Sequence, residues 1–140
     1  MIVLDASVAL KWFLTEEDED IAVQIKTNFI EGREEIAVPE LLLSEISNVL
    51  RYKPSFNKKA VKDAVSTILD MGVTIFTPNL WLYEQAISIA YDYNLTVYDA
   101  LYAALASELE CPLITADESL KDALPARFKV KLLRDVGNET

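Results

Sequence analysis

Four acidic residues stand where strands or helices are expected to begin, end or present a half-apolar face: Asp5, Glu45, Asp99 and Asp117. Asp5 follows the apolar run at residues 1–4, and Asp117 follows a short run at residues 113–115. If both runs are parallel strands, their C-terminal ends share one edge of a sheet. Carboxylates gathered there repel one another unless cations bind between them. Hard divalent ions such as Mg²⁺ prefer oxygen ligands, so this arrangement indicates metal-assisted chemistry.

Composition excludes several other catalytic chemistries. The chain has no histidine, which removes histidine-based triads and histidine-rich zinc sites. Its three glycines are too widely separated to build a phosphate-binding P-loop or a dinucleotide fingerprint. Cys111 is the only cysteine, so no internal disulfide can form, and we expect it to be a small packing residue.

The size of the chain is that of one domain, which we expect to span residues 1–140. Apolar residues make up 51% of it, enough for a real core. No apolar run approaches the roughly 18 residues of a membrane span, and no basic region precedes Asp5. We therefore expect a cytoplasmic protein without membrane contact.

The net charge of −10 limits the possible partners. Phosphate binding is driven largely by basic side chains, so a polyanionic substrate would need bound cations and a local basic patch. Alternatively, the acidic surface receives a basic protein partner.

Five short apolar runs have the length and composition of strands buried on both faces: residues 2–4, 36–38, 73–76, 113–115 and 130–133. Segments with helical spacing separate them, at residues 18–30, 39–52, 58–71 and 80–93, then at 99–105 and 118–123. Such alternation predicts parallel strands joined by right-handed crossovers. The fold class is therefore a three-layer α/β/α domain.

Three of the acids also have ordinary structural explanations. Asp5 or Ser7 could cap a helix N-terminus after the first strand, and Asp117 could cap the helix at 118–123. Residues Thr96 to Asp99 fit a capping box. Capping and ion binding are compatible, because one carboxylate oxygen can cap while the other faces an ion.

Glu45 lies beside the apolar face of its expected helix, where a carboxylate needs a partner. Asn48, three residues further on, projects the same way and could hold Glu45 or a water molecule. Glu45 taken by itself has both a structural and a functional interpretation. The occurrence of four such acids together favours a functional site.

Four stretches resemble the PIN-domain family, and within it the VapC-like toxins of prokaryotic toxin–antitoxin pairs. They are residues 3–7 (VLDAS), 39–50, 98–106 (YDALYAALA) and 113–117 (LITAD), in the order of the family. The resemblance implies a PIN-like fold with a central parallel sheet in the order 3-2-1-4-5. In that order the first and fourth strands are neighbours.

The resemblance also implies a metal-dependent endoribonuclease that hydrolyses phosphodiester bonds with Mg²⁺ or Mn²⁺ and leaves 5′-phosphates. Asp5, Asp99 and Asp117 map onto inner metal ligands. Glu45 maps onto a ligand, directly or through water, or onto the group that orients the attacking water. The supporting polar positions map onto Ser7, Asn48 and Thr115.

The implied partners are an RNA substrate, a VapB-like antitoxin and a second copy of the chain in a homodimer. Lys11, Arg51 and Lys53 are the possible RNA contacts near the expected site. Two alternatives stay open: a PIN-domain nuclease that processes RNA without a toxin role, and a non-catalytic PIN-like module that binds protein through its acids. A phosphatase is disfavoured, because Asp5 is not followed by a second aspartate two residues on.

Overall fold

A five-stranded, all-parallel sheet with strand order β3-β2-β1-β4-β5 forms the centre of the computed structural model, which describes residues 1–137. The strands are β1 (Ile2–Leu4), β2 (Ile36–Pro39), β3 (Thr74–Phe76), β4 (Leu113–Thr115) and β5 (Val130–Leu132). The expected α/β/α class and the strand order 3-2-1-4-5 are both confirmed.

The central strands are almost entirely apolar because both faces of the sheet are covered, and the exception is Thr115 at the end of β4. Every residue of β2 and β4 is buried. Val3 of β1 pairs with Ala37 on one side and with Leu113 on the other, so β1 lies in the middle of the sheet. The residue that follows β1 is therefore held by strands on both sides.

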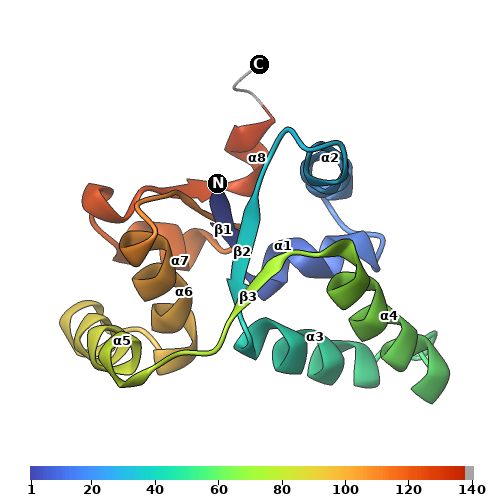
Figure 1. Cartoon of the computed structure of the whole chain (residues 1–140), viewed down its shortest axis with the longest axis horizontal. Helices are drawn as coiled ribbons and strands as arrows, with labels where there is room; N and C mark the ends of the chain where they lie inside the picture. Colours follow the sequence, from blue (N-terminus) through green and yellow to red (C-terminus); the bar gives the residue numbers. More distant parts are fainter. Residues whose placement is uncertain (138–140) are drawn as a thin grey trace.

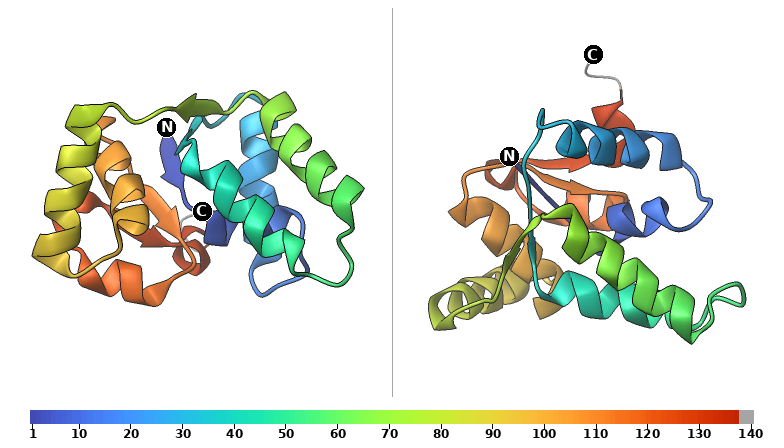
Figure 2. Two further views of the ribbon diagram at one scale, coloured as in Figure 1. Left: turned by 90° about the horizontal axis from the view of Figure 1, so that it is seen from below. Right: turned by 45° about the vertical axis from the view of Figure 1, so that its right-hand side comes forward.

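Eight α-helices and two 3₁₀ turns occur within residues 1–137. The helices are α1 (Ala6–Ala9), α2 (Glu19–Ile30), α3 (Leu41–Arg51), α4 (Lys58–Met71), α5 (Leu80–Tyr93), α6 (Val97–Glu108), α7 (Glu118–Ala123) and α8 (Leu133–Val136); the 3₁₀ turns are η1 (Leu10–Trp12) and η2 (Ala126–Phe128). Helix α6 packs on the sheet against β1, β2 and β4, and α5 packs on the outside of α6 (Figure 1). Helix α2 lies on the opposite side of the sheet (Figures 1 and 2).

Several expected boundaries were wrong by one or two residues: Pro39 belongs to β2, the helix expected at 39–52 is α3 at Leu41–Arg51, and the strand expected from residue 73 begins at Thr74. Two further differences have identifiable reasons. Helix α6 begins at Val97 and not at Asp99, because the Thr96 hydroxyl caps it by accepting a hydrogen bond from the Asp99 N–H at 3.0 Å. The last strand ends at Leu132, because Leu133 already begins the short helix α8.

The hydrophobic core surrounds the sheet and includes buried side chains of α2, α3, α4, α5 and α6. Leu105 of α6 is 2% exposed, and it belongs to the run of apolar side chains that α6 presents to its neighbours. No helix among residues 1–137 combines the length and hydropathy that a bilayer span requires.

We expect Leu105→Ala to lower the free energy of unfolding by about 2–5 kcal/mol, because it removes buried methyl groups and leaves a cavity. Leu69→Ala on α4 is the matched control, since Leu69 is 51% exposed, and it should change stability by only about 0.5 kcal/mol. Urea denaturation followed by circular dichroism measures both. Equal effects of the two substitutions would contradict this account of the core.

Candidate active site

The candidate site lies at the C-terminal ends of β1 and β4. The chain leaves β1 for β2 on one side and later returns to β4 on the other side, so the ends of these two strands form the topological switch point of the sheet. Open parallel sheets place their ligand sites there. Asp5 follows β1 directly, and Thr115 is the last residue of β4.

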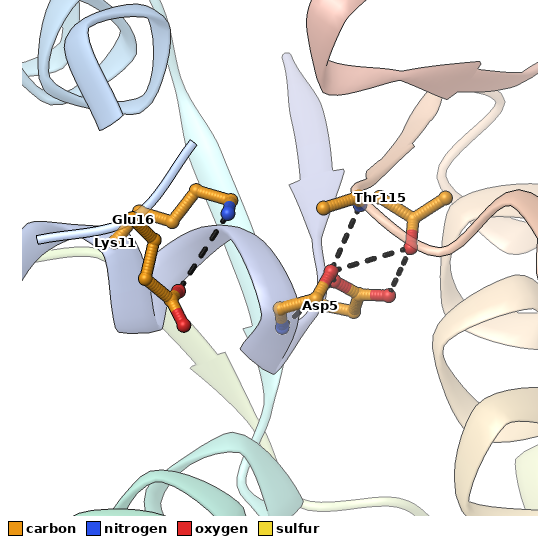
Figure 3. Close-up of polar contacts among 6 residues, drawn as sticks. Asp5, Lys11, Glu16 and Thr115 are labelled. Carbon is orange, nitrogen blue, oxygen red and sulfur yellow. Dashed lines mark hydrogen bonds and ion pairs between the residues drawn. The ribbon is translucent and has the colours of Figure 1, made fainter. Parts of the chain in front are cut away.

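Asp5 is buried and holds both strand ends together through hydroxyl groups. The Ser7 hydroxyl donates to Asp5 Oδ1 at 2.5 Å, and the Thr115 hydroxyl donates to Oδ2 at 2.5 Å. The same hydroxyls accept hydrogen bonds from the backbone N–H groups of Ala116 and Asp117. Figure 3 shows Asp5 and Thr115 pointing toward each other. Asp5 also caps α1, because Oδ1 accepts a hydrogen bond from the Ser7 N–H. The same residue therefore caps the helix and belongs to the candidate site.

Burial raises the pKa of Asp5 from its ordinary value of 3.8 to about 6. The hydrogen bonds from Ser7 and Thr115 lower this pKa and offset part of the increase, while the negative charge of Asp99 raises it further. The ionised form of Asp5 therefore has less solvation than it would have in water. A cation at this carboxylate would relieve that deficit.

Glu45 is held by a tyrosine. The Tyr102 hydroxyl, on α6, donates to Glu45 Oε1, on α3, at 2.6 Å, and Tyr102 is 1% exposed. Burial raises the pKa of Glu45, the hydrogen bond from Tyr102 lowers it, and the charge of Asp99 raises it. Burial and the bond to Glu45 raise the pKa of Tyr102 in turn, so the tyrosine remains a neutral donor.

This partner of Glu45 is a site residue that sequence reasoning missed, since Asn48 was the candidate for that role. Tyr102 sits in the apolar run of α6 and has the appearance of a core residue. The signal that could have found it is its hydroxyl, because a buried tyrosine O–H almost always has a partner. Its position one turn after Asp99 adds to that signal.

Asp99 and Asp117 complete the acidic edge. Burial and the charge of Asp117 raise the pKa of Asp99, while the bond from Thr96 lowers it. Asp117 caps α7 by accepting from the N–H and the hydroxyl of Ser119, at 2.9 and 2.6 Å. Asp99 thus lies within electrostatic reach of Asp5, Glu45 and Asp117.

The donor set of this edge fits a hard divalent cation. It contains carboxylates and hydroxyls without histidine, and its acids disfavour each other's charge, as expected of a group that lacks a counter-charge. Within residues 1–137 no three acids converge closely enough to enclose an ion by themselves. Mg²⁺ usually keeps several waters and takes only one or two carboxylates, so the spacing suits a hydrated ion.

The other residues singled out in the sequence lie in different surroundings. Asn48 and Arg51 line a groove between α3 and α4. Lys53 is exposed just beyond the end of α3. Lys11 forms an ion pair with Glu16 at 3.6 Å, to one side of Asp5 (Figure 3).

Comparison with known proteins places the chain in a family. The family model of the PIN domain matches residues 2–123, and the chain therefore belongs to the PIN-domain family. The ribonuclease VapC9 of Mycobacterium tuberculosis is 33% identical over 136 residues, which cover 95% of this chain and 98% of VapC9.

Two solved structures share the fold. PAE2754 from Pyrobaculum aerophilum has a TM-score of 0.71 at 22% identity, and the match covers 96% of this chain and 92% of the other. A chain of a toxin–antitoxin complex from Klebsiella pneumoniae has a TM-score of 0.71 at 16% identity, with 95% and 98% covered.

Proposed function

We propose that the protein is a ribonuclease that hydrolyses RNA phosphodiester bonds with Mg²⁺ or Mn²⁺. The observation that carries the proposal is the buried Asp5 at the switch point, fixed by Ser7 and Thr115 and within reach of the charge of Asp99. The 33% identity to a VapC ribonuclease over nearly the whole chain supports RNA as the substrate.

Different residues of the chain would bind the ion, position the ligands and orient the attacking water. Asp5, Asp99 and Asp117 are the carboxylates that would hold the hydrated ion, directly or through water, and Ser7 and Thr115 keep Asp5 aimed at the site. When bound, the ion supplies Lewis acidity toward water and phosphate. Tyr102 fixes Glu45 through Oε1, which leaves the second carboxylate oxygen of Glu45 free. That oxygen would either orient the attacking water or contact the ion, directly or through water. With water as the nucleophile and the 3′-oxygen of the preceding ribose as the leaving group, the products would carry a 3′-hydroxyl and a 5′-phosphate.

The test is end-mapped cleavage of total cellular RNA by the purified protein with Mg²⁺, with Mn²⁺ and with EDTA. Cleavage that requires the ion and leaves 5′-phosphates is the expected result. Asp99→Asn is the control for a contaminating nuclease and should be inactive. Ends that bear 2′,3′-cyclic phosphates, or equal cleavage in EDTA, would exclude this mechanism.

We expect Tyr102→Phe to lower the cleavage rate about tenfold, the usual effect of removing a group that orients a metal-site carboxylate. The phenylalanine ring still fills the core, but Glu45 loses its hydrogen bond. Single-turnover kinetics measure the effect, with Tyr93→Phe at the end of α5 as the matched control, because it also removes a hydroxyl that makes one side-chain hydrogen bond, in that case from Arg127. A Tyr102→Phe enzyme as fast as the control would show that Glu45 needs no such support.

The biological role that fits best is the toxin of a VapBC-type pair, working in the cytoplasm and held inactive by a VapB-like antitoxin. The VapC name of the relative and the toxin–antitoxin origin of a structural neighbour support this role. Physically, an antitoxin arginine placed against Asp5 and Asp99 would neutralise the acids and displace the ion. Growth arrest that follows expression of the chain and is relieved by an antitoxin tests the role.

A homodimer would cover an apolar face of α5. Leu80, Tyr83, Ile87 and Tyr91 are exposed along this helix, and Tyr98 near the start of α6 is also exposed. Apolar side chains gathered on one face mark an interaction surface. We expect light scattering after size-exclusion chromatography to give a dimer for the wild type and a monomer for Ile87→Glu. A monomeric wild type would contradict this arrangement.

A further inference from the structure

A groove of about 1000 Å³ lies between α3 and α4, which run as a hairpin to one side of the sheet (Figures 1 and 2). Its lining includes the partly buried apolar residues Leu43, Phe56 and Val61, and the exposed residues that form its rim are mostly polar and basic. Asn48 lines the groove one helical turn from Glu45. One end of the groove therefore lies near Glu45 of the acidic edge, and Arg51, which also lines the groove, lies about 9 Å from Glu45 along the axis of α3.

The charge of this region is opposite to that of the rest of the chain. Residues 51–62 hold five of the 13 basic residues and no acidic residue. Among residues 1–137, Lys58 and Lys62 make no ion pair, whereas Lys59 pairs with Asp63 at 2.8 Å. The groove therefore presents positive charge that nothing in the described part of the chain neutralises.

An aromatic ring stands at the rim. Tyr52 is 72% exposed, and the Arg51 guanidinium lies over its ring with Cζ 5.0 Å from the centroid. Exposed aromatic rings beside a basic groove are the combination that binds single-stranded nucleic acid, because bases stack on the rings while phosphates contact the cations.

We infer that the α3–α4 groove binds single-stranded RNA and leads it to the acidic edge, with a base on Tyr52 and phosphates at Arg51, Lys58 and Lys62. The inference rests on the proposed ribonuclease function, and it specifies the surface that binds the RNA substrate. An acidic protein segment is the competing occupant. The exposed ring beside unpaired cations favours RNA.

The test is fluorescence anisotropy of a fluorescein-labelled, unstructured RNA oligonucleotide in EDTA, where binding is measured without cleavage. We expect Tyr52→Ala to weaken binding about tenfold, in the usual range for loss of a stacked base. Lys58→Gln combined with Lys62→Gln should reduce the salt slope by about 1.4, which corresponds to two phosphate contacts on a single strand. Lys59→Gln is the matched control and should change neither quantity.

Thermal melting checks that each variant is folded. Equal affinity and salt slope in the wild type and the groove variants would overturn the inference, as would a wild type that binds no RNA. Unlabelled poly-L-glutamate serves as a second competitor. If it displaces the probe as well as RNA does, and Tyr52→Ala has no effect, the groove binds acidic protein instead. If RNA binding depends on the groove residues but the protein cleaves no RNA, the ribonuclease proposal fails and the inference that the groove binds RNA still holds.

Discussion

Asp5→Asn is expected to lower RNA cleavage by more than about 100-fold while leaving the protein folded. Residues that only orient a metal ligand contribute about 10–100-fold, and Asp5 is proposed to hold the ion itself. The substitution keeps the shape of the side chain and an oxygen that can accept from Ser7. Single-turnover cleavage of the mapped RNA target measures the loss.

Asp122→Asn on α7 is the matched control, because it removes the same charge from an exposed position. It should cleave at the wild-type rate. If Asp5→Asn retains most of its activity, the acidic edge is not where the reaction occurs.

The same substitution is expected to stabilise the ion-free protein at neutral pH. Because burial raises the pKa of Asp5 from 3.8 to about 6, the folded protein binds a proton here more tightly than the unfolded chain does. Stability from this group is complete below pH 3.8 and is lost as the pH rises through about 6. This change in the pKa of Asp5 corresponds to about 3 kcal/mol in the free energy of unfolding. Metal-free Asp5→Asn should therefore exceed the wild type by up to this amount at pH 7 and resemble it near pH 4.

Urea denaturation in EDTA at pH 4 and pH 7 measures the effect, with Asp122→Asn as the matched control for the loss of one exposed acidic side chain. Adding Mg²⁺ or Mn²⁺ at pH 7 should then stabilise the wild type more than Asp5→Asn, because the ion binds the folded state. A stability difference between the two proteins that does not change with pH would show that burial of Asp5 has no energetic consequence.

The strands were predictable because each is a short, mostly apolar run between helical segments. Residues 2–4 and 113–115 were placed correctly for this reason. Alternation of strands and helices indicated a parallel sheet, but the order of the strands came only from the resemblance to the PIN-domain family. Local spacing carries no information on which strands are neighbours.

Part of the geometry of the candidate site was predictable, because two of its residues stand at strand ends. Asp5 and Thr115 meet because β1 and β4 are adjacent. The hydrogen bond between Tyr102 and Glu45 could not be predicted, since the two residues are 57 positions apart on different helices and the tyrosine lies in an apolar run. The α3–α4 groove was also missed, because it depends on how two helices pack and not on the pattern within either one.

The hydrogen bond between Asp5 and Thr115 joins residues 110 positions apart, and this separation affects how the protein is made. A chain emerging from the ribosome carries Asp5 almost from the start, but the strand that completes its surroundings is synthesised more than a hundred residues later. Until then the edge of β1 has no β4 to pair with, and the acid has no Thr115 hydroxyl. If the proposed activity is correct, a nascent chain of this enzyme is harmless to the messenger that encodes it, because the catalytic edge forms only when translation of these residues is nearly complete.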